Sequence, residues 1–292
     1  MGKLVRTISA DGGVICIAVD TTDMVGRAEQ IHKTSATVTA ALGRLLTAAS
    51  IMGCTLKGKE DSVTLRLAGN GPVGSVIAVS DSEGNARGYV TNPVVEIPLN
   101  QYGKLDVAGA VGKEGYLSVI RDTGMKDPYI GHSPIVSGEI AEDITYYYAV
   151  SEQIPTVCGL GVLVNTDLTV LAAGGYLVQL LPGAGEDTID RLEENINGMK
   201  SVTQMLTDGL SPQDIAFLAL KGFDPQVLDE TTVEYRCNCS RDRMERALIS
   251  LGREELLRLA QEQEDTEMVC HFCGQKHHFS SRELRALAGE KE

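Results

Sequence analysis

Tryptophan is absent from this chain of 292 residues, and aromatic residues make up only 4% of it. A hydrophobic core must therefore be built from Val, Leu, Ile and Ala. The sequence also lacks the run of roughly 18–20 apolar residues that a membrane-spanning helix needs. No long apolar run follows the charged residues at the N-terminus, as it would in a secretory signal. We therefore expect a cytoplasmic protein that does not use a membrane.

Positive charge is scarce, with 26 Lys and Arg against 40 Asp and Glu and a net charge of −14. This balance disfavours general nucleic-acid binding, which needs cations to replace the counterions of phosphates. It also disfavours docking on an anionic membrane. The charge is uneven: residues 179–231 hold 3 basic and 10 acidic residues, a net −7, against −5 for 1–178 and −2 for 232–292. These shifts predict a core domain (1–178), an acidic linker (179–231) and a C-terminal module (232–292).

The hydrophobic periodicity predicts an α+β fold with a mixed N-terminal core, a helical linker and a small C-terminal domain. Strands are expected at 4–10 and 14–20, followed by one long helix from about 23 to 57. Residues 62–123 resemble β structure, 144–152 a helix, and 157–164 with 169–173 a hairpin. After Pro182 the period changes to that of an amphipathic helix, with apolar residues every three or four positions. Those positions are Ile189, Leu192, Ile196, Met199, Val202 and Leu206, and a second helix is expected from Ser211-Pro212.

Nucleotide-binding motifs receive no support. Residues 69–74 (GNGPVG) match G-x-G-x-x-G, but that fingerprint must open a helix, and here a β-branched run follows. We interpret the segment as a hairpin turn. A Walker A sequence is absent, and we expect no enzymatic activity and no catalytic residues.

The cysteines carry the strongest signal. Four of the seven, Cys237, Cys239, Cys270 and Cys273, form two close pairs in the last 56 residues. In a reducing compartment such pairs more often bind metal than form permanent disulfides. Four thiolates are the ligand set of a tetrahedral zinc site, and they leave no open position for a catalytic water. The intervening residues are helical in pattern, and Gly274 can take a positive φ beside the ligands.

Two kinds of zinc site remain open at this stage, a structural one and a redox-labile one. The first pair is C-x-C rather than the usual C-x-x-C, so its sulfurs can react with each other once a metal leaves. Arg236, Arg241 and Arg243 flank this pair and should favour the thiolate. We expect His271, His277 and His278 to lie at the surface or next to the ligand residues without binding the metal themselves. We expect the other three cysteines, at 16, 54 and 158, to be buried as small apolar side chains.

The strings around the cysteines, 235–240 (YRCNCS) and 269–274 (VCHFCG), resemble the redox-regulated heat-shock chaperone of about 33 kDa. The resemblance continues through 22–24 (TDM), 71–74 (GPVG), 137–139 (SGE) and 172–183 (AAGGYLVQLLPG). It therefore covers essentially the whole chain, and all four cysteines are in place.

This resemblance implies an ATP-independent holdase of the bacterial cytoplasm. It implies one Zn²⁺ per chain on Cys237, Cys239, Cys270 and Cys273 in an inactive, reduced form. Under oxidative stress the family's disulfides would be Cys237–Cys239 and Cys270–Cys273. Zinc then leaves, the linker unfolds, a homodimer forms, and unfolding clients are held and later passed to ATP-dependent chaperones. The client-binding residues are not indicated by the sequence.

Two other functions stay open. A constitutive zinc-ribbon adaptor would keep its metal in oxidant and should show a basic face. A dithiol–disulfide oxidoreductase would turn over small disulfides, although its C-x-x-C should lie in a βαβ unit. Within the holdase hypothesis, we expect the apolar stripe of the linker to be part of the switch, with a permanently packed helix as the alternative.

Overall fold

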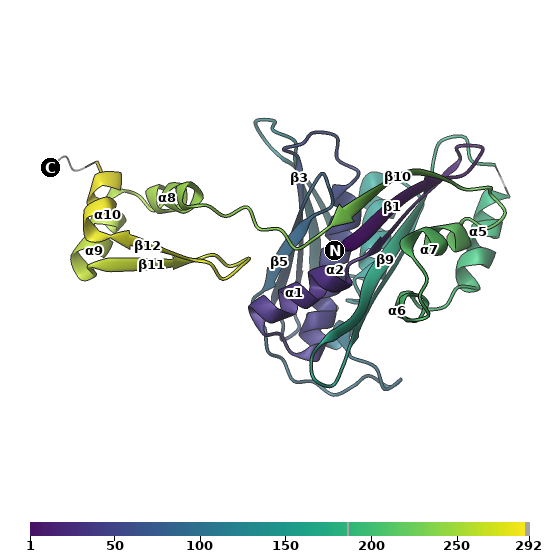
Figure 1. The fold of residues 1–292 in the computed structure, drawn as a ribbon, viewed down its shortest axis with the longest axis horizontal. Coiled ribbons are helices and arrows are strands. Elements are labelled where there is room, and N and C mark those ends of the chain that lie inside the picture. The colour runs from purple at the N-terminus through teal and green to yellow at the C-terminus, as the bar shows by residue number, and fades with distance from the viewer. Residues whose placement is uncertain (186, 290–292) are drawn as a thin grey trace. The chain divides into compact units, whose positions relative to one another are not determined.

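The computed structural model describes residues 1–185 and 187–289, which form two compact units (Figure 1). The first runs from Met1 to Arg236, and the second begins at Cys237, the first of the four clustered cysteines. Helices and sheets are both present, so the α+β prediction is confirmed. The three-part division drawn from charge remains a prediction, since the two units do not test where the linker begins.

The first unit is built around two five-stranded antiparallel sheets. Sheet A has the order β10-β1-β2-β9-β8. Its strands are β1 (Gly2–Ile8), β2 (Val14–Asp20), β8 (Thr156–Val164), β9 (Val170–Leu180) and β10 (Gln226–Val233). Sheet B has the order β5-β4-β3-β6-β7. Its strands are β3 (Ser62–Gly69), β4 (Ser75–Asp81), β5 (Ala86–Val90), β6 (Gly115–Asp122) and β7 (Tyr129–Pro134).

The longest helix, α2 (Ala36–Gly53), packs against both sheets. It contacts strands of both, and all but two of its residues are buried. Aliphatic residues from α2 and from one face of each sheet form the main core, as the lack of tryptophan requires. Length and composition alone would allow α2 to cross a membrane, but 89% of it is buried inside the protein. Its apolar character therefore matches a core helix.

The prediction of one helix from 23 to 57 is wrong. The structure has two helices, α1 (Thr22–His32) and α2, with a break at Lys33. Lys33 takes a left-handed conformation with φ of 52°, which ends α1 by donating its N–H to the carbonyl of Glu29. The apolar spacing continues through this break, so periodicity could not reveal it.

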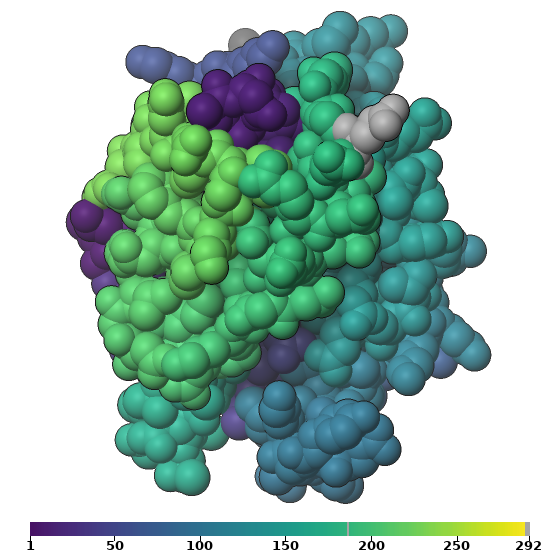
Figure 2. Space-filling model, turned by 90° about the vertical axis from the view of Figure 1, so that its right-hand side faces the viewer, coloured from purple at the N-terminus to yellow at the C-terminus, as the bar shows by residue number. Residues whose placement is uncertain are grey.

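The linker helices cover the outer face of sheet A. They are α5 (Thr188–Asn197), α6 (Val202–Thr207) and α7 (Pro212–Ala219), and they occupy much of the green surface in Figure 2. The apolar stripe predicted as one helix is divided between α5 and α6, because the chain turns at residues 198–201. The helix predicted at Ser211-Pro212 is confirmed, and a capping box between Ser211 and Asp214 begins it.

This contact forms a second, smaller core. Sheet A contributes Val14, Cys16, Ala18, Tyr176 and Val178. The linker contributes Leu192, Val202, Met205, Ile215, Ala216, Ala219, Leu220 and Phe223. The packing is incomplete at α5, where an apolar groove of about 260 Å³ separates the helix from β8 and β9. Ile189 beside this groove is 49% exposed.

Several elements were not predicted. Strands β7 and β10 and the short helix α3 (Val107–Val111) were missed, and the helix expected at 144–152 is α4 (Ala141–Tyr147) followed by a π turn (Tyr148–Glu152). The turn at 69–74 joins β3 to β4, which confirms the hairpin interpretation. Cys16, Cys54 and Cys158 pack in or against the cores, and burial raises the pKa of each to about 12.

The second unit is small. It contains α8 (Arg241–Ser250), α9 (Arg253–Glu262), the hairpin β11 (Asp265–Val269) and β12 (Lys276–Ser280), and α10 (Ser281–Leu287). Among its described residues, six buried side chains form the core: Leu248, Leu256, Ala260, Phe279, Leu284 and Ala288. The helical character expected between the cysteine pairs is confirmed by α8 and α9.

Candidate metal centre

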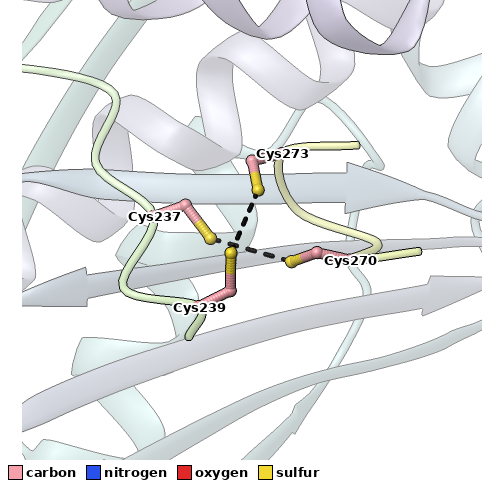
Figure 3. A group of neighbouring side chains, drawn as sticks. All are labelled: Cys237, Cys239, Cys270 and Cys273. Carbon is pink, nitrogen blue, oxygen red and sulfur yellow. Dashed lines mark hydrogen bonds between the residues drawn. The ribbon is translucent and has the colours of Figure 1, made fainter. Parts of the chain in front are cut away.

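The four predicted cysteines meet at one point although 30 residues separate the two pairs. Cys237 and Cys239 lie on the segment that leads into α8, and Cys270 and Cys273 lie on the turn between β11 and β12. Figure 3 shows the four sulfurs pointing toward one another. All four lie within 4.8 Å of one another, and Cys270 is buried.

The sulfur positions match a tetrahedral thiolate site. At a Zn–S distance of about 2.3 Å, tetrahedral sulfurs lie roughly 3.8 Å apart. The Sγ atoms of Cys237 and Cys270 are 3.8 Å apart, and those of Cys239 and Cys273 are 3.3 Å apart. The cluster could therefore hold a metal ion, and its size and donor set are consistent with zinc. The four thiolates would fill the coordination sphere of that ion.

The second pair is held by a tight turn between two strands. The Gly274 N–H donates to the Cys270 carbonyl at 2.9 Å, and the Cys270 N–H donates to the Gln275 carbonyl at 2.9 Å. Gly274 has φ of 71°, the positive value expected from the sequence. Because an L side chain rarely adopts this conformation, glycine keeps both cysteines of the turn on the same side.

The first pair is positioned by the start of α8. Ser240 caps this helix by accepting the Arg243 N–H, and the Arg243 guanidinium donates to the Asn238 side chain at 2.8 Å. Asn238 lies between Cys237 and Cys239, so this bond fixes the middle of the C-x-C segment. Arg241 anchors the same turn, because its guanidinium lies 4.4 Å from the Phe279 ring centre and bonds Glu283.

The thiols do not share one environment. Burial, followed by hydrogen bonds with neighbouring thiols, raises the pKa of Cys239, and burial raises that of Cys237 to about 11. For Cys270 burial acts in the same direction, but the N–H groups of Cys273 and Phe272 stabilise the thiolate, and the net pKa is lowered. The turn at the second pair thus favours negative charge on its sulfur.

The expected effect of the flanking arginines is wrong for Cys237 and Cys239, whose pKa values are raised. Burial is the largest cause of these raised pKa values, and the flanking arginines bond other groups. Arg236 bonds Glu83 at 2.9 Å and Glu234 at 3.0 Å, and Arg241 bonds Glu283. Arg243 bonds the Asn238 side-chain oxygen, so all three guanidinium groups bond oxygen atoms.

The histidines lie outside the ligand set. His277 is buried in β12, and His278 is exposed with its ring 2.7 Å from Asp265. One neighbour of the sulfurs was not predicted: the Gln275 side-chain oxygen lies 3.4 Å from the Cys239 sulfur. Its place directly after Gly274 was the only signal in the sequence that could have indicated it.

Comparison with known proteins gives the family of the chain. The family model described as Hsp33 protein matches residues 2–280. The chain belongs to the Hsp33 family. A 33 kDa chaperonin from Ruminiclostridium cellulolyticum is 46% identical over 287 residues, covering 98% of both chains. Another, from Acetivibrio thermocellus, is 47% identical over 284 residues, covering 97% of this chain and 96% of its own.

A solved structure extends the similarity to the fold. The 33 kDa chaperonin (heat shock protein 33 homologue) from Thermotoga maritima has a TM-score of 0.89 and 38% identity. The match covers 98% of this chain and 97% of the other. The family relationship supports a chaperone, and the cysteine cluster gives that chaperone a candidate metal site.

Proposed function

We propose that this chain is a redox-regulated, ATP-independent holdase that is inactive while zinc is bound and active after its cysteines are oxidised. The observation that carries the proposal is the cluster of Cys237, Cys239, Cys270 and Cys273, which lies in a unit with a very small core. The family relationship gives the chaperone class, and the cluster gives the means of control.

Zinc bound to the four thiolates would supply folding free energy to the second unit. In small zinc-binding peptides this energy is about 10–16 kcal/mol. Six buried apolar residues cannot replace it, because a module of this size rarely gains more than about 3–5 kcal/mol from its core. The second unit should therefore unfold when its thiolates no longer hold a metal.

Oxidation would remove the ligands two at a time. Hydrogen peroxide takes two electrons from a pair of thiolates and two protons from the solvent, which leaves one S–S bond and two water molecules. Two such steps use all four cysteines, and Zn²⁺ is released because no thiolate remains. We propose the pairs Cys237–Cys239 and Cys270–Cys273, following the family resemblance. The sulfur distances allow other pairings as well, since all four lie within 4.8 Å.

Several features of the linker helices would let them open when the second unit unfolds. Helices α5, α6 and α7 have ten, six and eight residues, too few to be stable in water without tertiary packing. The linker region carries a net −7, and the groove beside α5 forfeits packing contacts. Opening these helices would uncover the apolar outer face of sheet A, including Val14, Tyr176 and Val178.

Exposed apolar surface is what a holdase offers to an unfolding protein. On this proposal the activated chain dimerises, holds its clients in the cytoplasm without ATP, and releases them to ATP-dependent chaperones after reduction. No step requires a catalytic residue. The zinc-ribbon adaptor and the dithiol oxidoreductase remain the alternative outcomes of the test.

The decisive experiment combines zinc release with suppression of aggregation. The reduced, zinc-loaded protein is treated with peroxide, free zinc is measured with a chromogenic chelator, and light scattering follows thermally unfolding malate dehydrogenase. We expect about one zinc per chain to be released together with a gain in holding activity. An adaptor would show neither change, and an oxidoreductase would turn over small disulfides without holding the client.

A further inference from the structure

The β6–β7 hairpin carries an exposed apolar surface far in sequence from the linker. The register pairs Tyr116 with Pro134 and Ile120 with Ile130, so these four side chains share the outer face of sheet B. Tyr116 is 62% exposed and Ile130 51%. Between them on the other face of the hairpin, Leu117, Val119, Gly131 and Ser133 are buried, so the middle of the hairpin is well packed on its inner side.

Strand β7 is also the open edge of its sheet. The Ile135 N–H donates to the Gly115 carbonyl, and from this bond the alternation of an antiparallel ladder places the odd-numbered residues of β7 against β6. The backbone N–H and C=O groups of Ile130 and His132 therefore point away from the sheet. Within residues 1–185 and 187–289, no strand pairs with this edge. Such an edge is a template for another extended chain.

At the opposite edge of sheet B, a segment of the chain itself pairs with the edge strand β5. There the Ala86 N–H donates to the Glu234 carbonyl at 3.1 Å, and the Arg236 N–H donates to the Ala86 carbonyl at 3.0 Å. An extended segment of the chain itself thus lies parallel to the start of β5. Strand β7 offers the same backbone groups together with exposed apolar side chains, and in the described part of the chain no strand pairs with it.

The charge of the outer face of sheet B indicates what kind of segment could bind beside β7. Across the sheet, Arg66 on β3 lies opposite Ser118 on β6, which lies opposite His132 on β7. The rows from Thr64 to Ala68 and their partners on β6 and β7 contain no carboxylate, in a chain whose net charge is −14. The face therefore suits an apolar extended segment with neutral or acidic side chains.

We propose that β7 binds an extended segment of an unfolding protein as an added strand, with the client's apolar side chains against Tyr116, Ile120 and Ile130. This proposal rests on the proposed holdase function and names a surface for it. The β7 edge is open while α5, α6 and α7 still cover sheet A. It would therefore act as a weak first contact, and the face uncovered by the linker would add a second contact to the same client. Two linked contacts bind far more tightly than either alone.

The test uses the full-length, peroxide-treated protein and fluorescent, carboxymethylated α-lactalbumin as the unfolded probe. His132→Pro removes an edge N–H without removing a bond to β6, and we expect about a tenfold weaker affinity by anisotropy. His132→Ala keeps that N–H and should lose less than twofold. Ile130→Lys should weaken binding by a similar factor, whereas Leu171→Lys, at a 52% exposed position on β9, should not.

Amide hydrogen exchange gives a readout that does not depend on any variant. We expect the probe to slow exchange at Ile130 and His132. Unchanged affinity for both His132→Pro and Ile130→Lys, with no new protection, would overturn the β7 proposal while the holdase survives. Failure of the wild-type protein to bind the probe would instead defeat the holdase itself. Protection that grows with protein concentration and needs no probe would assign the edge to a second copy of the chain, which also overturns the proposal.

Discussion

The two units of this chain are stabilised in different ways. The first is held by a large aliphatic core around α2, in which both sheets and most of the helix are buried. The second has six buried apolar residues and a cluster of four sulfurs. Removing one buried side chain from the first unit should cost about 2–5 kcal/mol. If zinc binds the second unit as proposed, removing one sulfur would also remove the folding free energy that the metal supplies. On the proposed function, this contrast would let the second unit respond to oxidants while the first unit stays folded.

Within the first unit the same contrast recurs on a smaller scale. The inner face of sheet A packs against α2, and its outer face packs against the short, acidic linker helices. The cluster of buried apolar residues becomes smaller from the main core to the core beneath the linker helices to the second unit. Regions of low local stability are those that open first.

The largest effect is expected when one of the four clustered cysteines loses its sulfur. In Cys270→Ser we expect zinc binding to be lost and the second unit to unfold, with amides of 237–289 exchanging at nearly the rate of an unstructured chain. The first unit should keep its protected amides. Hydrogen exchange with mass spectrometry measures both regions in one sample. Cys54→Ala, which removes a buried thiol outside the cluster, is the control and should retain about one zinc. A second unit that stays protected in Cys270→Ser would show that its core suffices without metal.

Weakening the linker core tests the next level. Ile215 is fully buried between α7 and sheet A, and Ile215→Ala should cost about 2–5 kcal/mol. We expect faster exchange over 188–223 and measurable client holding while zinc is still bound. Leu218→Ala on the same helix, at a 40% exposed position, should change little. Faster exchange without any holding activity would separate linker opening from client binding and contradict the switch.

Much of the fold could be predicted where one face of an element is buried. Strand β2 was located to the residue, because its apolar run is bounded by the Asp11-Gly12-Gly13 turn. Strand β10 was missed because it is an edge strand with nearly every side chain exposed, so it has no apolar alternation. Its partner is β1, more than 200 residues away, and no local pattern records such a pairing. Strand β7 was missed for a similar reason, since it contains Gly, His and Pro.

The candidate site was predicted better than its surroundings. The spacing of the cysteines was enough to predict that Cys237 and Cys239 lie beside the second pair, because thiolate pairs of this kind carry a strong metal-binding signal. The electrostatics were not predictable in the same way. Arg236 and Arg241 bind carboxylates that only the tertiary fold brings close to them. A guanidinium paired with a carboxylate stabilises a nearby thiolate less than an unpaired one would.

A smaller effect is expected where the first unit ends. The Tyr235 hydroxyl donates to the Gly88 carbonyl at 2.9 Å and accepts the Gly88 N–H at 3.3 Å, two residues before the first clustered cysteine. Tyr235→Phe should destabilise this anchor by about 1–2 kcal/mol, since it leaves two backbone groups without that partner. We expect faster exchange over 226–236 with zinc affinity unchanged. Tyr102→Phe, on a 75% exposed side chain, is the control. A loss of zinc affinity in Tyr235→Phe would show that the anchor and the metal site are coupled.

The smallest expected effect concerns how the stability of the linker helix α7 changes at acidic pH. Ser211 donates from its hydroxyl and its N–H to the Asp214 carboxylate at 2.6 and 2.9 Å, and these bonds lower the pKa of Asp214. A carboxyl whose pKa is lowered by folding stabilises the folded state above its ordinary pKa of about 3.9, and that contribution fades as the pH falls through the lowered value. Asp214→Asn should therefore cost a few tenths to about 1 kcal/mol at neutral pH, because the group is exposed, and almost nothing near pH 2. Exchange of the α7 amides between pH 2 and pH 7 measures the difference. If wild type and variant lose protection in parallel over that range, the capping box is not what holds α7 on sheet A, and the packing of Ile215 and its neighbours carries the linker alone.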